Sequence, residues 1–525
     1  MLDLGTSFLA SVSRDPDAVA VVDGDLRLSY RAWLGRIAAL VASFDDLGLR
    51  SGDRLVTVLQ NRWEAATLHW ACQFAGIVIT PVNWRAKADE IDFCLEDSGA
   101  RGVVYEGVSS AAVASSARAA GLVSIAVGPE PEAGGTGAAV PFGVLLENDA
   151  GAAVPRAGPD AVSVMLYTSG TTSWPKGVPR RHRAERAAGL AHVAQNLYRH
   201  GETTLGVMPL YHTMGVRSLI AMSLVGGTFV CLPRYDTRTA LALIERERIT
   251  NLYLVPTLYH DLVHDPAFAA TDVGSVRKLG FAGASMTDGL LRRLDDAFRP
   301  ELFVNHYGSS EIYTFTVNQK AVDKPGSAGR AGINQMVRVV RLAAQSPDDL
   351  AGPGEEGEIT ALLAGDESFE GYWRRPDADA RALRDGWYFT GDTGYVDKDG
   401  DLFVTGRVDD MIITGGENVS PVEIESCLSL HPAVSEVAVV GLPDERWGKI
   451  VVAFVKRAAA VAADDLDRFC RLSSLADYKR PRRFVFVREL PKSPVGKLLR
   501  RQLVAGAYSL DTDPDTGTDP ARGAA

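Results

Sequence analysis

The chain has 525 residues, of which 46% are hydrophobic and 23% are charged, and a formal net charge of −11 at pH 7. This length exceeds the size at which one hydrophobic core stops growing, so two or more domains are expected. The acidic balance argues against nucleic acid or an anionic membrane as the main partner, because both repel a negatively charged surface.

No targeting or membrane segment is evident. The first residues lack the basic start and long apolar core of a signal peptide, and the longest apolar run, residues 218–232, contains two glycines and is too short to span a bilayer. The five cysteines are widely spaced and odd in number, which favours buried free thiols in a reducing compartment. We therefore expect a cytoplasmic protein.

Helix-like and strand-like segments alternate from about residue 27 to residue 260. Residues 239–248 carry apolar side chains at helical spacing, and residues 251–255 then have the pattern of a short buried strand. Residues 128–137 are rich in glycine, proline and glutamate and predict an exposed loop. Such alternation predicts an α/β fold with largely parallel sheets, in which ligands bind at the strand ends.

The most informative stretch is residues 167–178, with the sequence YTSGTTSWPKGV. It follows an apolar run, residues 161–167, that predicts a buried strand. Hydroxyls, glycine amides and the Lys176 ammonium group are gathered within ten residues, as binding of a triphosphate requires. Since Lys176 precedes Gly177, this is not the ordinary phosphate loop, and a solvated turn is the alternative interpretation.

The last part of the chain predicts a separate small domain. A boundary is expected at residues 406–410, followed by strands at residues 434–440 and 450–455. We predict an N-terminal domain over residues 1–408, a C-terminal α+β domain over residues 409–510, and a disordered tail over residues 511–525, which is rich in Asp, Thr, Gly and Pro.

Five motifs in this order resemble those of the adenylate-forming superfamily, which includes acyl-CoA synthetases, luciferases and adenylation domains. They are residues 167–178, 307–311 (YGSSE), 388–392 (YFTGD), 406–410 (GRVDD) and 491–497 (PKSPVGK). The resemblance implies a large multi-layer N-terminal domain joined by a hinge to a small C-terminal domain. It also implies ATP and Mg²⁺ as requirements.

The resemblance assigns the nucleotide site. Glu311 is the implied Mg²⁺ ligand, and a carboxylate oxygen suits that hard cation. Asp392 and Arg407 are implied to hold the ribose and phosphate, since an arginine fork engages two oxygens at once. The implied ATP-binding residues are Thr168, Ser169, Gly170, Thr171, Thr172, Lys176, Gly283, Tyr307, Ser310, Asp392 and Arg407.

The same resemblance implies that the small domain moves. Lys497 is expected to neutralise charge at the α-phosphate while pyrophosphate leaves. Asp409 is the expected hinge, about which the domain rotates to withdraw Lys497 and to bring residues 415–418 toward a thiol tunnel. Ser173 stands where the family usually has glycine, which predicts slower adenylation if the backbone there needs a positive φ.

Within the superfamily the chain is most similar to the aryl-acid CoA ligases of the 4-chlorobenzoate:CoA ligase group. Further matches lie at residues 208–212, 281–286, 406–418, 446–448 and 479–481. His212 corresponds to a gate residue between the acid and thiol channels. The implied acid-binding residues are Ala191, His212, Thr213, Met214, Tyr253, Ala284, His306, Gly308, Tyr313 and Thr314.

Three of these acid-binding residues differ in type from the chlorobenzoate enzymes. Ala191 replaces a phenylalanine and enlarges the pocket, whereas His306 and Tyr313 replace apolar residues and add hydrogen-bonding groups. We therefore predict a substituted hydroxybenzoate or naphthoate as the acid, because a site with buried polar groups discriminates against ligands that leave them unpaired.

Coenzyme A is the implied thiol substrate. The residues assigned to it by the resemblance are Arg85, Gly416, Glu417, Trp447, Tyr478, Arg480 and Arg482. Basic and aromatic side chains suit its phosphates and adenine. The partners are thus small molecules, with a homodimer as the expected assembly. Two alternatives stay open: an adenylation enzyme that loads a carrier protein, and a non-adenylating relative that transfers an acyl group.

Overall fold

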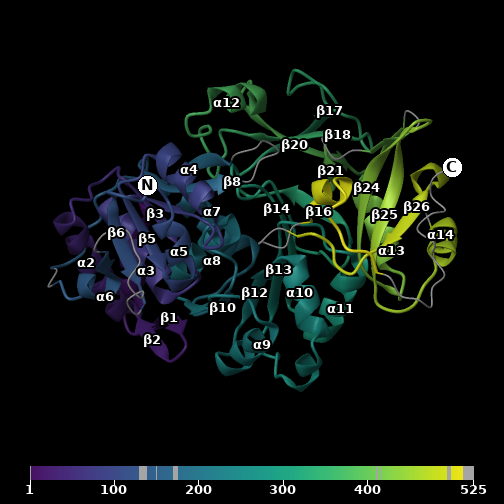
Figure 1. Cartoon of the computed structure of the whole chain (residues 1–525). Coiled ribbons are helices and arrows are strands. Elements are labelled where there is room, and N and C mark those ends of the chain that lie inside the picture. The colour runs from purple at the N-terminus through teal and green to yellow at the C-terminus, as the bar shows by residue number, and fades with distance from the viewer. Residues whose placement is uncertain are drawn as a thin grey trace.

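A computed structural model describes residues 2–128, 139–148, 151–168, 175–408, 412–414, 417–473, 475–492 and 498–511. The predicted loop at 128–137 and tail at 511–525 therefore lie almost wholly outside the described residues, as do several predicted site residues discussed below. The described chain is a mixed α/β protein with a large N-terminal part and a smaller C-terminal part (Figure 1), so the predicted fold class is confirmed.

One sheet of the N-terminal part has seven strands. In spatial order they are β7 (Val140–Pro141), β6 (Val123–Val127), β5 (Gly102–Glu106), β3 (Arg54–Val58), β4 (Val78–Pro81), β8 (Val162–Thr168) and β9 (Lys176–Arg181). All neighbours run parallel except β8 and β9, which are antiparallel. The strand predicted over residues 161–167 is confirmed as β8.

The second sheet has fourteen strands, and one half of it is mainly parallel. This half consists of β14 (Leu302–Tyr307), β13 (Lys278–Phe281), β12 (Asn251–Leu254), β10 (Thr203–Gly206), β11 (Thr228–Cys231), β1 (Val19–Asp23) and the antiparallel edge strand β2 (Leu26–Ser29). The strand predicted at residues 251–255 is confirmed as β12. The carboxyl ends of the parallel strands share one edge, which positions the loops that carry the predicted site residues.

The other half of this sheet is antiparallel, which the sequence did not predict. It consists of β15 (Thr316–Asn318), β16 (Ser327–Ala331), β21 (Leu402–Arg407), β20 (Trp387–Val396) with β19 (Leu383–Arg384) beside it, β18 (Gly357–Leu362) and β17 (Val337–Arg341).

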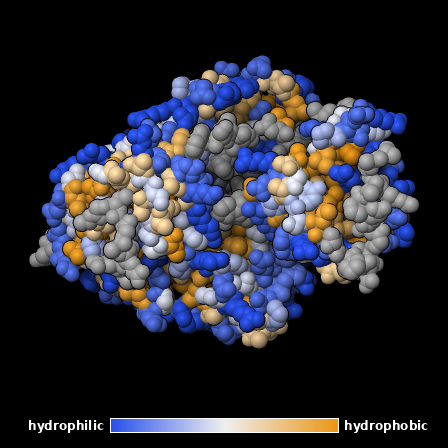
Figure 2. Space-filling view, in the orientation of Figure 1, coloured by the Kyte–Doolittle hydropathy of each residue, from blue (hydrophilic) through white to orange (hydrophobic). Residues whose placement is uncertain are grey.

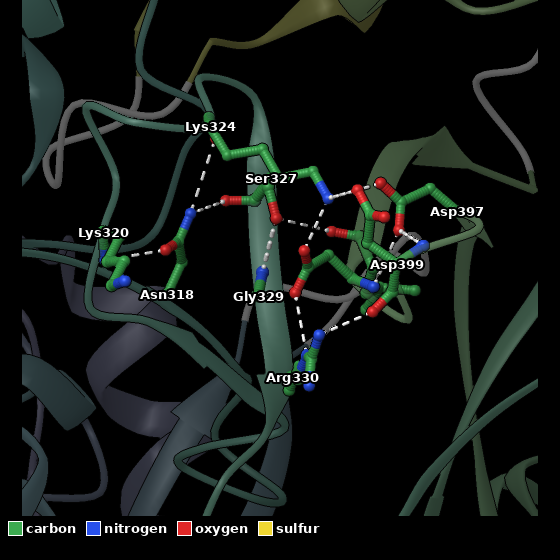
Figure 3. Close-up of polar contacts among 10 residues, drawn as sticks. Asn318, Lys320, Lys324, Ser327, Gly329, Arg330, Asp397 and Asp399 are labelled. Atoms are coloured by element: carbon green, nitrogen blue, oxygen red, sulfur yellow. Dashed lines mark hydrogen bonds and ion pairs between the residues drawn. The ribbon is translucent and has the colours of Figure 1, made fainter.

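Lysine 324 anchors the turn between β20 and β21 (Figure 3). Its Nζ lies 2.5 Å from a carboxylate oxygen of Asp397, 3.0 Å from one of Asp399 and 2.6 Å from one of Asp401. These hydrogen bonds raise the pKa of Lys324 above its usual range. Arg330 on β16 also contacts Asp401, at 3.1 Å. One end of the β20–β21 hairpin is thus held to the segment that precedes β16.

Helices cover both sheets. Those of the N-terminal part are α1 (Leu4–Arg14), α2 (Tyr30–Asp46), α3 (Trp63–Ala75), α4 (Ala88–Ser98), α5 (Gly107–Ala114), α6 (Phe142–Leu145), α7 (His182–Gln195), α8 (Thr213–Leu224), α9 (Thr237–Arg246), α10 (Pro256–His264), the 3₁₀ helix η1 (Pro266–Ala270), α11 (Asp288–Phe298) and α12 (Pro376–Ala382). The helix predicted at residues 239–248 is confirmed as α9, which begins after the capping side chain of Asp236.

A shared core joins the two N-terminal sheets. Apolar side chains of α1, α2, α3, α7 and α8 pack with Leu55 and Ile79 of the seven-stranded sheet and with Val21 and Phe229 of the larger one. Trp33 and Trp70 are fully buried in this layer. Among the described helices none is long and apolar enough to cross a membrane. Figure 2 shows hydrophilic side chains over much of one face, with apolar ones in separate patches.

The C-terminal part has its own sheet of β24 (Val434–Asp444), β25 (Gly448–Arg457) and β26 (Arg483–Phe486), and a ribbon of β22 (Ile412–Thr414) and β23 (Glu417–Val419). Figure 1 places this sheet at the far side of the molecule from the seven-stranded sheet. Its helices are α13 (Pro421–Ser429), α14 (Ala463–Leu472), the 3₁₀ helix η2 (Asp477–Lys479) and α15 (Arg500–Val504). The strands predicted at residues 434–440 and 450–455 are confirmed, although the hairpin extends further. All five cysteines are free thiols, and four are buried.

Candidate active site

The predicted phosphate loop connects two paired strands. Thr168 ends β8 and lies opposite Lys176, the first residue of β9, so the loop leaves the end of this hairpin. Its residues Ser169, Gly170, Thr171, Thr172 and Ser173 lie outside the described residues. The structure thus describes only the strand residues on either side of the loop.

Lysine 176 lies beside Glu311 and Tyr372. Its Nζ is 4.0 Å from the centroid of the Tyr372 ring, and the Tyr372 hydroxyl donates a 2.7 Å hydrogen bond to Glu311 Oε1. Partial burial lowers the pKa of Lys176, and the Glu311 carboxylate opposes this shift. Tyr372 thus lies between a cation and a carboxylate from two distant motifs. Tyr372 was missed by the sequence analysis, because no motif marks it.

The buried Arg180 holds the backbone of the motif at residues 307–311. Arg180 Nη1 donates to the Glu311 carbonyl oxygen at 3.0 Å and to that of Ser310 at 3.4 Å. Arg180 itself forms a fully buried ion pair with Glu185. At Gly308 any Cβ would lie 2.1 Å from the Tyr313 carbonyl oxygen, so no larger residue fits this turn. The backbone that carries Glu311 is therefore tightly constrained.

Tyr307, Asp392 and Arg407 form a second group on three strands. The Tyr307 hydroxyl donates to Asp392 Oδ2 at 2.6 Å, and Arg407 Nη1 lies 2.8 Å from Asp392 Oδ1. Burial and the neighbouring carboxylate raise the pKa of Tyr307 well above its usual range, so its hydroxyl stays protonated. Gly391 has φ +72°, and a Cβ there would lie 3.1 Å from Arg407 Nη2. The positive φ therefore favours glycine at position 391, directly before Asp392 within β20.

Gly283 lies in the loop after β13 with φ +83°, and Ala284 next to it is exposed. His212 caps α8, where its Nδ1 accepts a 3.3 Å hydrogen bond from the Met214 amide. Both residues follow carboxyl ends of the parallel strands, beside Tyr307 at the end of β14. Nucleotide and acid residues of the prediction thus share one edge of the large sheet.

The predicted acid-binding residues fall into a buried and an accessible group. Ala191, Met214, Tyr253, His306, Tyr313 and Thr314 are buried, whereas His212 and Thr213 are partly exposed and Ala284 and Gly308 are exposed. The Tyr313 hydroxyl, predicted to face the acid, donates to Glu185 Oε2 at 3.2 Å. Its ring lies under the Arg180 guanidinium at 3.8 Å. Tyr313 therefore already has a protein partner.

Aromatic rings that the sequence analysis missed surround His306. His192 on α7 lies 5.3 Å from His306 and 4.6 Å from Tyr253, between ring centroids. The Asn196 side-chain nitrogen lies 3.0 Å from His306 Nε2. Burial lowers the pKa of both histidines well below the usual range, so both rings are neutral. In the sequence these residues have the appearance of ordinary helix positions.

The predicted CoA residues are only partly grouped. The Arg482 guanidinium lies 4.4 Å from the Trp447 ring centroid, and Arg85 lies 3.7 Å from the neighbouring Trp84. Arg480 instead forms ion pairs with Asp467 and Asp477, and Tyr478 is exposed. Gly416, the Glu417 side chain, the hinge residue Asp409 and the predicted catalytic Lys497 lie outside the described residues.

Comparison with known proteins places this site in a family. Residues 8–373 match the family model described as AMP-binding enzyme, and residues 423–497 match the AMP-binding enzyme C-terminal domain. The chain is 34% identical to a 4-chlorobenzoate–CoA ligase of Arthrobacter sp over 515 residues, covering 97% of this chain and 96% of that protein. It is 32% identical to a feruloyl-CoA synthase of Amycolatopsis sp over 504 residues, covering 95% and 98%.

Solved structures agree with these sequence relatives. ATP-bound MatB from Rhodopseudomonas palustris superposes with a TM-score of 0.85 at 27% identity, covering 96% of this chain and 99% of that one. CoA ligases of this family use ATP, Mg²⁺ and CoA. The chain therefore belongs to the AMP-binding enzyme family, and within it to the acyl- and aryl-CoA ligases, which are AMP-forming acid–thiol ligases.

Proposed function

We propose that this protein is an ATP-dependent aryl-acid:CoA ligase that acts on a substituted hydroxybenzoate or naphthoate. In the first step the acid carboxylate attacks the α-phosphorus of ATP and pyrophosphate leaves. In the second step the CoA thiol attacks the acyl carbon and AMP leaves. The observation that carries the proposal is the convergence of Lys176 with Glu311 and of Tyr307 with Asp392 and Arg407.

In this proposal the phosphates lie along the loop from Thr168 to Lys176, and the base packs near Gly283, Tyr307 and Ser310. Asp392 accepts hydrogen bonds from the ribose hydroxyls, and Arg407 orients Asp392. Tyr307 keeps one oxygen of Asp392 occupied, which fixes the direction of the other. The second domain supplies Lys497 and turns about Asp409, whereas the gate role of His212 rests on the resemblance.

The residues present fit a magnesium ion whose ligands are mainly oxygen atoms of the substrate. Among the described residues no cluster of three or more His, Cys, Asp or Glu side chains is arranged to hold a metal. Glu311 would therefore be the protein ligand and the phosphate oxygens the others, which is the usual arrangement for Mg²⁺ in nucleotide sites. When bound, the ion would offset charge on the triphosphate.

Two observations favour an aromatic acid. Tyr253 and His306, two of the predicted acid-binding residues, form a buried aromatic group with His192. Two relatives are named for aryl acids, namely 4-chlorobenzoate–CoA ligase and feruloyl-CoA synthase. Ala191 is buried, and its small side chain, where the resemblance gives phenylalanine, is the reason we propose a larger ring system. Stacking and edge contacts with such rings favour flat substrates.

The test has two stages. Acid-dependent exchange of pyrophosphate into ATP, measured over a panel of benzoates, hydroxybenzoates and naphthoates, reports the first step. AMP release on addition of CoA or of a phosphopantetheinyl carrier protein then reports the second and separates free CoA from a carrier. Absence of exchange with every acid of the panel would favour a non-adenylating relative and end the proposal.

A further inference from the structure

A buried arginine on α8 is the most unusual group near the predicted acid pocket. Arg217 lies one helical turn after Thr213 and Met214, on the same helix face. Its side chain is buried at 2% exposure. In the sequence Arg217 directly precedes the apolar run at residues 218–232, and no motif marks it.

The guanidinium of Arg217 donates to three oxygens, all of neutral groups. Nη1 donates to the Thr314 hydroxyl at 2.7 Å and to the Tyr313 carbonyl oxygen at 3.2 Å, and Nη2 donates to the Tyr253 hydroxyl. Thr314, Tyr313 and Tyr253 all belong to the predicted acid pocket. Among the described residues Arg217 Nε has no hydrogen-bond partner.

Among the described residues no carboxylate forms an ion pair with Arg217 by contact. Arg180 and Glu185 form their own buried ion pair. Burial raises the pKa of Glu367 and the charge of Arg217 opposes this shift, so the two groups interact at a distance, while Asn334 donates to Glu367 Oε1 at 3.1 Å. A buried cation whose hydrogen-bond partners are all neutral is costly in free energy unless an anion joins it.

A second polar atom faces the same group of rings. His306 Nδ1 is buried and, within the described part of the chain, has no partner. The His306 ring centroid lies 5.4 Å from that of Tyr253, whose hydroxyl accepts from Arg217. A buried polar atom without a partner is costly in free energy, so a ligand group that reached Arg217 Nε and His306 Nδ1 would stabilise both.

We propose that Arg217 is a specificity-determining residue of the acid pocket, and that its guanidinium binds an anionic oxygen substituent that the aryl acid carries in addition to its reacting carboxylate. This inference rests on the proposed function. It narrows the proposed substituted hydroxybenzoates and naphthoates to those that carry a second acidic group, such as a second carboxylate. His306 Nδ1 is then the neighbouring hydrogen-bonding atom for the same substituent.

The probes are benzoate, 3- and 4-hydroxybenzoate, isophthalate and terephthalate, with kcat/KM measured by pyrophosphate exchange. The wild type should prefer at least one dicarboxylate to benzoate by about tenfold or more, since a buried donor discriminates strongly against a ligand that leaves it unpaired. Arg217→Met should lower kcat/KM for the preferred dicarboxylate at least about tenfold more than for benzoate. Arg217→Lys should restore part of the preference.

Arg248→Gln is the matched control, because Arg248 is an exposed arginine paired with Asp272 at the surface. It should leave the order of preference unchanged. Equal losses for all acids in Arg217→Met would make Arg217 a structural residue and overturn the inference. If that variant does not fold, the acid panel measured on the wild type tests the inference. Equal kcat/KM for benzoate and the dicarboxylates would overturn it. A preference for hydroxybenzoates over dicarboxylates would also overturn it, because the substituent bound by Arg217 would then not be an anion. If no acid supports exchange, the proposed function fails instead.

Discussion

The Tyr307 hydroxyl is hydrogen-bonded to Asp392 Oδ2 at 2.6 Å, although the two residues are 85 positions apart in the chain. Arg407 holds the other carboxylate oxygen of Asp392 at 2.8 Å. Both oxygens are therefore oriented before a nucleotide arrives, which lowers the cost of ordering the site on binding.

Replacement of Asp392 by Asn should raise KM for ATP by about tenfold or more, because hydrogen bonds to a charged acceptor contribute about 1.5–3 kcal/mol. Tyr307→Phe is the control, since it keeps the ring and the carboxylate and removes one donor; its effect should be several-fold smaller. The measurement is the ATP dependence of pyrophosphate exchange at saturating acid. Equal KM values for wild type and Asp392→Asn would exclude a ribose contact.

Glu311→Gln should lower the exchange rate by roughly 100-fold and raise the Mg²⁺ concentration needed for half-maximal rate, because the amide is a poor ligand for a hard cation. Tyr372→Phe keeps the carboxylate and loses only the 2.7 Å hydrogen bond to it. The two variants should therefore differ in Mg²⁺ dependence. An unchanged Mg²⁺ titration in Glu311→Gln would remove Glu311 from the metal site.

Lys497→Ala should abolish adenylation but spare thioester formation from a supplied acyl-adenylate, since the proposed rotation withdraws this lysine before the second step. The prediction rests on the resemblance, because Lys497 lies outside the described residues. Single-turnover assays of each half-reaction test it. Equal loss of both half-reactions would contradict the rotation.

Arg482→Gln should raise KM for CoA by several-fold to about tenfold, because it removes one charge-assisted contact to a phosphate. Pyrophosphate exchange does not require CoA and should be much less affected. Arg468→Gln in the same domain is the control, as Arg468 is exposed and paired with Asp465. A normal KM for CoA in Arg482→Gln would remove this residue from the CoA site.

Stability should fall between about pH 6.5 and pH 4. Burial lowers the pKa of His182 to about 4, and Asp3 opposes this shift. Since the unfolded state takes up a proton near pH 6.5 and the folded state only near pH 4, stability is lost as the pH falls through this window, by up to about 3 kcal/mol from this group.

His182→Asn tests this contribution, because the amide oxygen can accept from the Leu4 backbone as Nδ1 does at 3.4 Å. The drop in melting temperature from pH 6.5 to pH 4 should be smaller in the variant than in the wild type. His69, whose pKa is lowered to about 3 by burial and by the neighbouring His182, remains in both proteins and takes up its proton below this pH window. Identical pH profiles would show that His182 does not contribute.

Local patterns in the sequence predicted the α/β class, the strand before the phosphate loop and the nucleotide motifs. The antiparallel half of the large sheet was missed, because its strands mix polar and apolar residues and return from distant parts of the chain. The β24–β25 hairpin was predicted too short for a similar reason: its ladder continues to Asp444 opposite Gly448, where apolar alternation has ended.

Of the residues near the proposed acid pocket, only those that the family resemblance assigns could be predicted from the sequence. Arg217 lies on a helix whose other residues are apolar or small, and His192 lies on a helix with several other polar residues. Each contacts Tyr253 only after the chain has folded. No spacing rule links them. The proposed role of such residues depends on contacts between distant parts of the chain and on polar atoms without a hydrogen-bond partner. Both can be identified only in the structure.

The salt-bridged turn at Asp397, Asp399 and Asp401 has a consequence for the nucleotide site at the other end of the same hairpin. β20 and β21 present Asp392 and Arg407 opposite each other, whereas Lys324 ties down the connecting turn. Lys324 thus fixes the turn of the hairpin, at the end remote from Asp392 and Arg407. Loss of the Lys324 ion pairs would therefore weaken binding at the proposed nucleotide site by making the hairpin less rigid, without removing any contact to the ligand.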